Sequence, residues 1–156
     1  MDLFPAFQFL HVITMFAAVA AATMPELVLH VIARRGDVAG LRGFMPIAAV
    51  AGRLIPILFV VGLVFGIIAA LTGQIDLLRP WLIASYVVFA IAMATGALLS
   101  EPWGRRLGEA AFGSPLDAPN PELVAAIHDR RGVISTVVLM SAIVVIVFLM
   151  VVKPGG

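Results

Sequence analysis

Four long apolar stretches, separated by short polar segments rich in arginine, dominate the pattern of this 156-residue chain. A helix of about 20 residues crosses the ~30 Å hydrocarbon core of a bilayer, and each stretch reaches that length. The pattern predicts an all-α fold, namely a polytopic membrane protein with a bundle of four transmembrane helices in one domain, 1–156. The expected spans are residues 5–33, 46–72, 80–99 and 133–152.

Prolines and tryptophans mark several of the expected helix ends. Pro46 and Pro80 suit the first turn of the second and third helices, where the missing N–H costs nothing. Trp81 and Trp103 stand at the two ends of the third span and are expected as interfacial anchors, because tryptophan favours the membrane–water boundary.

The third connection, residues 100–132, is expected as a polar loop that carries one short surface helix. Asn120 supplies a cap for a helix over Pro121–Arg131, with a proline in the first turn. Leu123 and Ile127 give this helix an apolar edge, which is expected to lie on the membrane or on a partner.

The composition supports the membrane class. Hydrophobic residues make up 62% of the chain and charged residues 12%, against about 25% charged in soluble domains. The chain has no cysteine, which excludes disulfides, thiolate catalysis and cysteine-ligated clusters. We find no Ser-His-acid pattern, phosphate-binding glycine loop or paired carboxylates, so no catalytic residue is expected and enzyme activity stays undecided.

The arginines set the expected orientation. Eight of the ten basic residues fall in the first and third connections or beside them, and only Arg79 and Lys153 fall at the other end. The positive-inside rule then places both arginine-bearing connections in the cytoplasm and both termini outside it, on the periplasmic side of a bacterial inner membrane.

The first span carries a polar stripe. On a helical wheel, positions 8, 11, 15, 18, 22 and 26 fall within roughly 80° of one another. Three of them are Gln8, His11 and Glu26, and His30 lies at the margin. Because polar groups are costly in hydrocarbon, this stripe is expected to face the other helices.

His11 lies about two turns from the N-terminal end of its helix and is the candidate ligand for haem or a metal ion. Haem on His11 would be five-coordinate or would take a methionine, Met140 or Met150, as the second ligand. Met15 is excluded as that ligand, because it lies one turn away on the same helix. The alternative is a hydrogen bond inside the bundle to Tyr86, Ser85 or Gln8.

Glu26 and His30 form a second candidate cluster about 22 Å from His11 along the same helix. Arg53 is expected at a similar depth on the second helix, and a Glu26–Arg53 ion pair would keep both charges in the membrane. The cluster serves either as a structural clasp or as a proton relay or anion pocket.

The opening Phe9-Leu10-His11-Val12 resembles that of an uncharacterised family of bacterial four-helix inner-membrane proteins with a domain of unknown function. More distantly, it is similar to the CopD and HemJ families. The HemJ resemblance implies haem on His11. Those families usually carry a tryptophan and a Gly-Gly pair after the histidine, whereas Ala18, Ala20 and Ala21 occupy that region here. HemJ proteins also use a lysine in the membrane, and the only lysine here is Lys153, near the C-terminus. The resemblance therefore does not extend to the protoporphyrinogen oxidase activity of HemJ proteins.

Two functions follow as hypotheses. One is a small b-type haem-binding or electron-transfer protein with His11 as the axial ligand. The other is a non-catalytic accessory subunit or assembly factor of a larger membrane complex, or a homo-oligomer, with no nucleic acid partner. The small-residue ridge of Gly62 and Gly66 is expected to serve helix packing inside the chain, with a contact to another subunit as the alternative.

Overall fold

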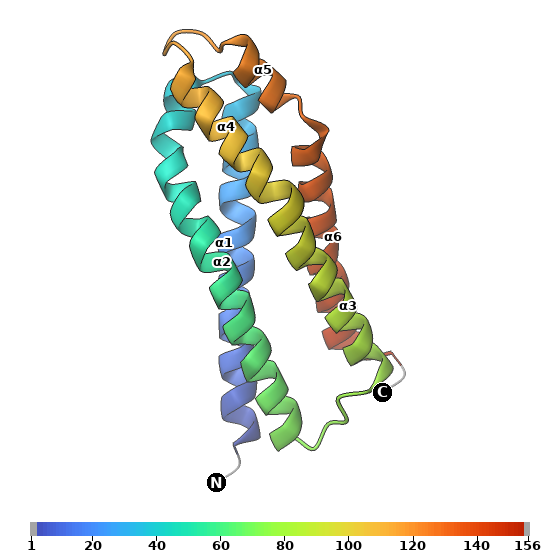
Figure 1. The fold of residues 1–156 in the computed structure, drawn as a ribbon. Helices are drawn as coiled ribbons and strands as arrows, with labels where there is room; N and C mark the ends of the chain where they lie inside the picture. The colour runs from blue at the N-terminus through green and yellow to red at the C-terminus, as the bar shows by residue number, and fades with distance from the viewer. Residues whose placement is uncertain (1–2, 155–156) are drawn as a thin grey trace.

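The computed structural model describes residues 3–154 and confirms the all-α fold, because these residues form helices and turns but no strand (Figure 1). The elements in chain order are α1 (Phe4–Arg34), α2 (Val38–Thr72), α3 (Pro80–Thr95), the π-helix η1 (Gly96–Ser100), α4 (Glu101–Gly113), α5 (Pro121–Ile127) and α6 (Arg130–Val152). Since α3, η1 and α4 follow one another without a break, they form a single long rod.

The long helices pair into two antiparallel hairpins. α1 packs along α2, the rod of α3 and η1 packs along α6, and α1 touches α6 over only a short stretch. The two hairpins meet chiefly where α4 packs on α2. The aromatic rings of Phe59 on α2 and Phe89 on α3 make a further contact, with their centroids 5.9 Å apart. Both chain termini lie at one end of the bundle, here called the terminal end, and α4 and α5 lie at the arginine-rich end (Figure 1).

The second helix begins earlier than its prolines suggested. It starts at Val38, where the Asp37 side chain accepts a hydrogen bond of 2.8 Å from the backbone N–H of Gly40 and caps the helix. Pro46 therefore lies inside α2 rather than at its start. The apolar run that follows Arg53 predicted the span itself. The first turns of α2 are amphipathic and lie before that run, so the sequence analysis did not include them in the helix.

The expected loop 100–132 is largely helical. The rod continues through Pro102 as α4, because Trp103, Leu107 and Ala111 fall on one face and bury it. α5 stops at Ile127, shorter than expected, since Asp129 caps the next helix by accepting a 2.9 Å hydrogen bond from the N–H of Arg131.

A compact apolar core fills the arginine-rich end. Leu41 of α2, Leu107 of α4 and Leu123 of α5 are fully buried in it, and Trp103 is 2% exposed. The edge of α5 thus packs on α4 of its own chain rather than on a membrane or a partner. Trp103 is no interfacial anchor either, because its Nε1–H donates a 3.0 Å bond to the carbonyl of Ala126.

The end of α4 is fastened by an arginine from α2. Arg42 donates hydrogen bonds to the carbonyl oxygens of Ala111, Phe112 and Ser114, at the end of α4 where carbonyl groups run out of partners within the helix. Trp81, at the terminal end of α3, is likewise buried, and the Lys153 ammonium lies 5.7 Å from the centre of its ring.

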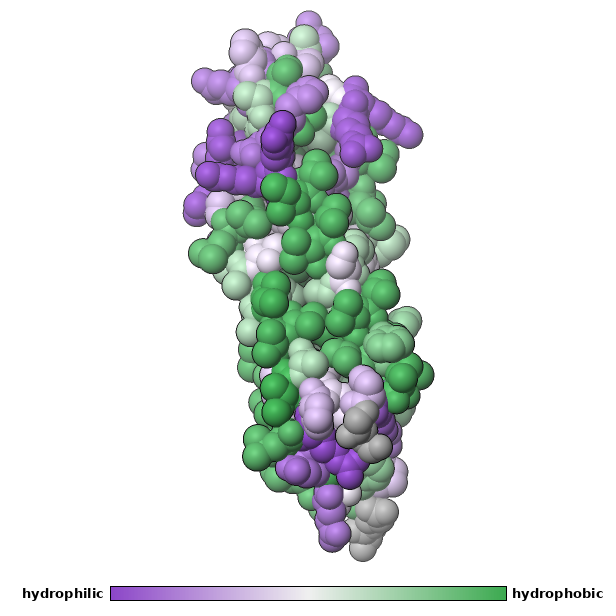
Figure 2. All heavy atoms as spheres, turned by 90° about the vertical axis from the view of Figure 1, so that its right-hand side faces the viewer, coloured by the Kyte–Doolittle hydropathy of each residue, from purple (hydrophilic) through white to green (hydrophobic). Residues whose placement is uncertain are grey.

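Four helical segments are long and apolar enough to cross a bilayer: Phe4–Arg34, Val38–Thr72, Pro80–Gly113 and Pro121–Val152. The chain is thus a multi-pass membrane protein, and apolar side chains cover the surface between two polar ends (Figure 2). α1 and α2, of 31 and 35 residues, are longer than a bilayer requires.

Counting about 20 residues from the terminal end reaches Glu26, Arg53, Ser100 and Gly132 on the four spans. These residues mark the expected inner boundary of the hydrocarbon.

Candidate functional site

His11 joins α1 to α2 through a backbone hydrogen bond. Its Nδ1 lies 2.7 Å from the carbonyl oxygen of Gly62. A carbonyl oxygen only accepts, so Nδ1 carries the proton, and in the neutral ring Nε2 keeps its lone pair. The bonded partner is thus a backbone group of α2.

The Gly62 and Gly66 ridge lets α1 and α2 approach closely. A methyl group on Gly66 would stand 2.7 Å from His11 Nδ1, and one on Gly62 would stand 2.5 Å from the sulfur of Met15. Glycine is required at both positions for the observed packing. In this structure the ridge serves contacts within the chain, which accords with the expectation of intramolecular packing.

The other residues expected near His11 lie elsewhere. Tyr86 sits on α3, and Met140 and Met150 sit on α6, a helix that α1 scarcely contacts. Ser85 donates to the carbonyl of Trp81 at 2.7 Å. Gln8 is exposed, and within residues 3–154 no hydrogen bond joins it, Tyr86 or Ser85 to His11.

Glu26 forms the most connected polar contact in the spans. Its Oε1 accepts a 2.8 Å hydrogen bond from Thr136 of α6, and its Oε2 lies 3.4 Å from the hydroxyl of Ser100. One carboxyl group therefore links α1 to both helices of the second hairpin. This is also the level at which the bilayer core is expected to end.

The contact coincides with the π-helix. Ser100 is the last residue of η1, and wide turns of this kind often occur at functional sites, where an extra residue redirects a side chain. An ionisable group inside a membrane span is a functional-site hypothesis on its own account. Both features meet at Glu26, which makes it the strongest candidate site among the described residues.

The Thr136 hydroxyl group lies between two oxygen acceptors. Its hydroxyl oxygen lies 2.8 Å from Glu26 Oε1 and also 2.8 Å from the carbonyl oxygen of Gly132, and a hydroxyl donates only one proton. The single proton of the Thr136 hydroxyl is therefore shared between the Glu26 carboxyl group and the backbone carbonyl of Gly132.

His30 continues the cluster toward the arginine-rich end. Its Nδ1 lies 3.0 Å from the backbone oxygen of Glu26, and its ring stacks on Trp103 with centroids 4.8 Å apart. Gly132 lies against the same indole, because a methyl group there would come within 2.5 Å of its Cε2. His30 is thus held between the polar contacts of Glu26 on its terminal side and the apolar core on its arginine-rich side.

The predicted Glu26–Arg53 ion pair is not formed. Within residues 3–154 the only ion pair joins Arg106 to Asp129 at 3.1 Å. Glu26 turns toward α6 and η1, whereas Arg53 is exposed on the outward face of α2, among the exposed side chains of Val50 and Ile57. The similar depth of the two residues was inferred from their place in sequence, but they point to different sides of the hairpin.

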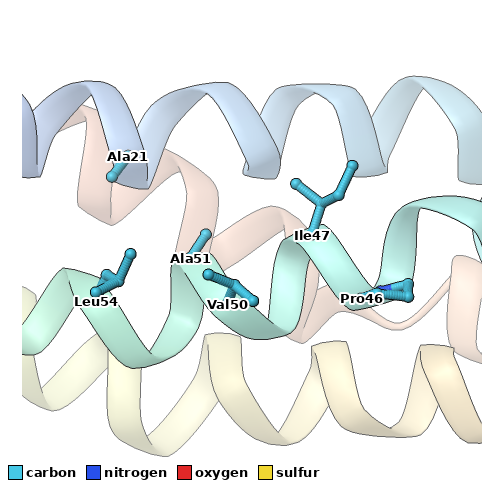
Figure 3. Close-up of a pocket in the computed structure, with 6 residues that line it drawn as sticks. All are labelled: Ala21, Pro46, Ile47, Val50, Ala51 and Leu54. Carbon is cyan, nitrogen blue, oxygen red and sulfur yellow. The ribbon is translucent and has the colours of Figure 1, made fainter.

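An apolar groove lies beside Arg53 on the surface between α1 and α2. Its volume is about 440 Å³, and Figure 3 shows its lining residues, which are Ala21 of α1 and Pro46, Ile47, Val50, Ala51 and Leu54 of α2. No cluster of three or more metal-ligating side chains occurs in the described part of the chain, residues 3–154.

Comparison with known proteins gives no relative: no family model, curated protein or solved structure matches this chain.

Proposed function

We propose that this protein is a non-catalytic accessory subunit of a larger membrane complex. The supporting observation is the contrast between the polar side chains of α1 and the surface of α2. His11, Glu26 and His30 are engaged in contacts that hold the chain together. Arg53 is left exposed in an otherwise apolar spanning face. We further propose that the arginine-rich end faces the cytoplasm of a bacterial inner membrane and that both termini are periplasmic.

The face of α2 around Arg53 suits a partner helix. Val50, Leu54 and Ile57 are about half exposed, and the adjacent groove offers room for the side chains of a second helix. Arg53 at the edge of the hydrocarbon favours a partner with a carboxylate at that level, since pairing reduces the cost of a charge at this depth. The proposed occupant is a transmembrane helix of another protein with an Asp or Glu near its inner end.

Site-specific photo-crosslinking in the membranes of the native host tests this proposal. A photoreactive residue in place of Val50 should give one discrete adduct, and one in place of Val144 on α6, a position 68% exposed, should give none. The adduct should weaken several-fold with Arg53→Gln and persist with Arg53→Lys. Equal adducts at both positions, no adduct, or an adduct with twice the mass of the chain would overturn the proposal.

A haem on His11 is the second candidate. It is supported by the Nδ1–H bond to the Gly62 carbonyl, because an acceptor of this kind orients a histidine and leaves Nε2 available to bind the haem iron. A bound haem would supply one-electron transfer. Since α1 barely touches α6, Met140 and Met150 are poorly placed as second ligands, and the five-coordinate form is favoured.

A reduced-minus-oxidised absorption spectrum of the protein purified from membranes tests this candidate. A Soret difference that disappears with His11→Ala and persists with His128→Ala, a matched change at an exposed histidine, supports it. A featureless spectrum, or one unchanged in His11→Ala, removes the haem while leaving the accessory role standing.

A further inference from the structure

A second pocket lies at the arginine-rich end, between the last turn of α1 and the junction of α5 with α6. Its volume is about 290 Å³, and it is lined by Arg34, Ile127, His128, Arg130 and Val133. The lining combines two guanidinium groups and an imidazole with two aliphatic side chains. The apolar groove beside Arg53, by contrast, has no charged lining residue.

The positive charge of this pocket is not balanced within the described chain. Asp129 is the nearest acidic residue in sequence, and its carboxylate is already paired with Arg106 at 3.1 Å and bonded to the N–H of Arg131 at 2.9 Å. His128 lies with Nδ1 at 2.8 Å from the Val124 carbonyl, which makes Nδ1 the donor. Arg34 and Arg130 are exposed and form no ion pair within residues 3–154.

The pocket also lies at the right depth for a lipid headgroup. Counting about 20 residues from the terminal end of α6 places the edge of the hydrocarbon at Gly132. Val133 is then on the acyl-chain side of that edge and Arg130 on the headgroup side. A ligand that fills this pocket should therefore carry an anionic group joined to an apolar part.

We propose that this pocket binds the phosphate of an anionic phospholipid, with Arg34 and Arg130 contacting the phosphate oxygens. Guanidinium groups bind phosphate through paired N–H donors, and basic pockets between helices at this membrane face suit anionic headgroups. Ile127 and Val133 contact the first carbons of the acyl chains. The site is independent of the accessory role proposed above.

Native mass spectrometry of the purified full-length protein, titrated with lipid in detergent, tests the site. Phosphatidylglycerol should bind as a discrete adduct, whereas phosphatidylcholine with the same acyl chains should bind at least roughly tenfold more weakly. The double variant Arg34→Gln, Arg130→Gln should lose the phosphatidylglycerol preference. The control, Arg35→Gln with Arg105→Gln, removes the same charge from exposed arginines of the same end and should keep it.

Two further arms separate the sources of phosphate and guard against misfolding. Inorganic phosphate should not compete with phosphatidylglycerol, because it lacks the apolar part. The Arg34→Lys, Arg130→Lys variant keeps the charge and should bind more weakly than the native chain but more strongly than the glutamine pair. Equal loss in both glutamine doubles, equal binding of the two lipids, or full competition by phosphate would each overturn the proposal.

Discussion

Two polar contacts of α1 differ in how they are built. His11 meets α2 within one hairpin, where glycines bring the helices so close that a histidine reaches a backbone carbonyl at 2.7 Å. Glu26 meets the other hairpin through two hydroxyl groups, at 2.8 and 3.4 Å. The first contact depends on shape and the second on hydrogen bonds between side chains. We therefore expect the first to be rigid and intolerant of added volume, and the second to be adjustable.

Gly66→Ala should have the largest effect in this comparison. Its methyl group would stand 2.7 Å from the His11 ring, which has no flexible end to move away. We expect a loss of about 2 kcal/mol in the free energy of unfolding, the usual scale of an overpacked contact. Unfolding by SDS in mixed micelles, followed by circular dichroism, measures it.

The matched control is Gly52→Ala, also on α2, where no atom lies within 4 Å of the added methyl group. This change should be neutral or slightly stabilising, because alanine favours helix more than glycine. In a His11→Ala background the cost of Gly66→Ala should shrink to less than half, since the opposing ring is gone. An undiminished cost would show that the clash lies elsewhere.

Glu26→Ala should have an intermediate effect. It removes both hydroxyl contacts between the hairpins, and interhelical hydrogen bonds in membrane proteins contribute about 0.6 kcal/mol each. We expect a loss of about 1 kcal/mol in the same assay. Glu26→Gln should lose less, because the amide keeps an oxygen that can accept the hydrogen bond from Thr136. A glutamine variant as weak as the alanine variant would contradict this account.

Arg53→Gln should have the smallest effect, with no measurable change in stability. Arg53 is exposed and forms no ion pair with Glu26, so the effects of Glu26→Gln and Arg53→Gln should add. A double-mutant cycle decides the point. A coupling clearly different from zero would mean that the two residues interact in the bilayer after all.

The long-range pattern of the sequence predicted the fold class, because four apolar runs longer than a bilayer require leave few other arrangements. The stripe of α1 was informative in part: Met15, Ala18 and Glu26 face other helices, as expected, whereas Gln8 is exposed. The starts of α2 and α4 were missed since their amphipathic turns lie beyond the apolar runs and include prolines, which the helices tolerate.

The contacts within the candidate site were less predictable. Thr136 and Ser100 had no assigned role, because a hydroxyl in a spanning helix usually returns a bond to its own backbone, as Thr136 also does to Gly132. A signal was present for one of them: Glu26 and Ser100 lie at similar distances from the terminal ends of α1 and α3. Depth alone gave a wrong partner for Arg53, because the direction in which a side chain faces also depends on how the two helices pack. The π-helix that ends at Ser100 has no recognisable signal in the sequence.

The hydrogen bonds from Arg42 to the last carbonyl groups of α4 make the end of one helix depend on a residue 69 to 72 positions earlier in the chain. A peptide cut from this region alone would lack the guanidinium group that completes its final turn and should fray in solution. The last turn of α4 is therefore complete only when α2 is packed against it.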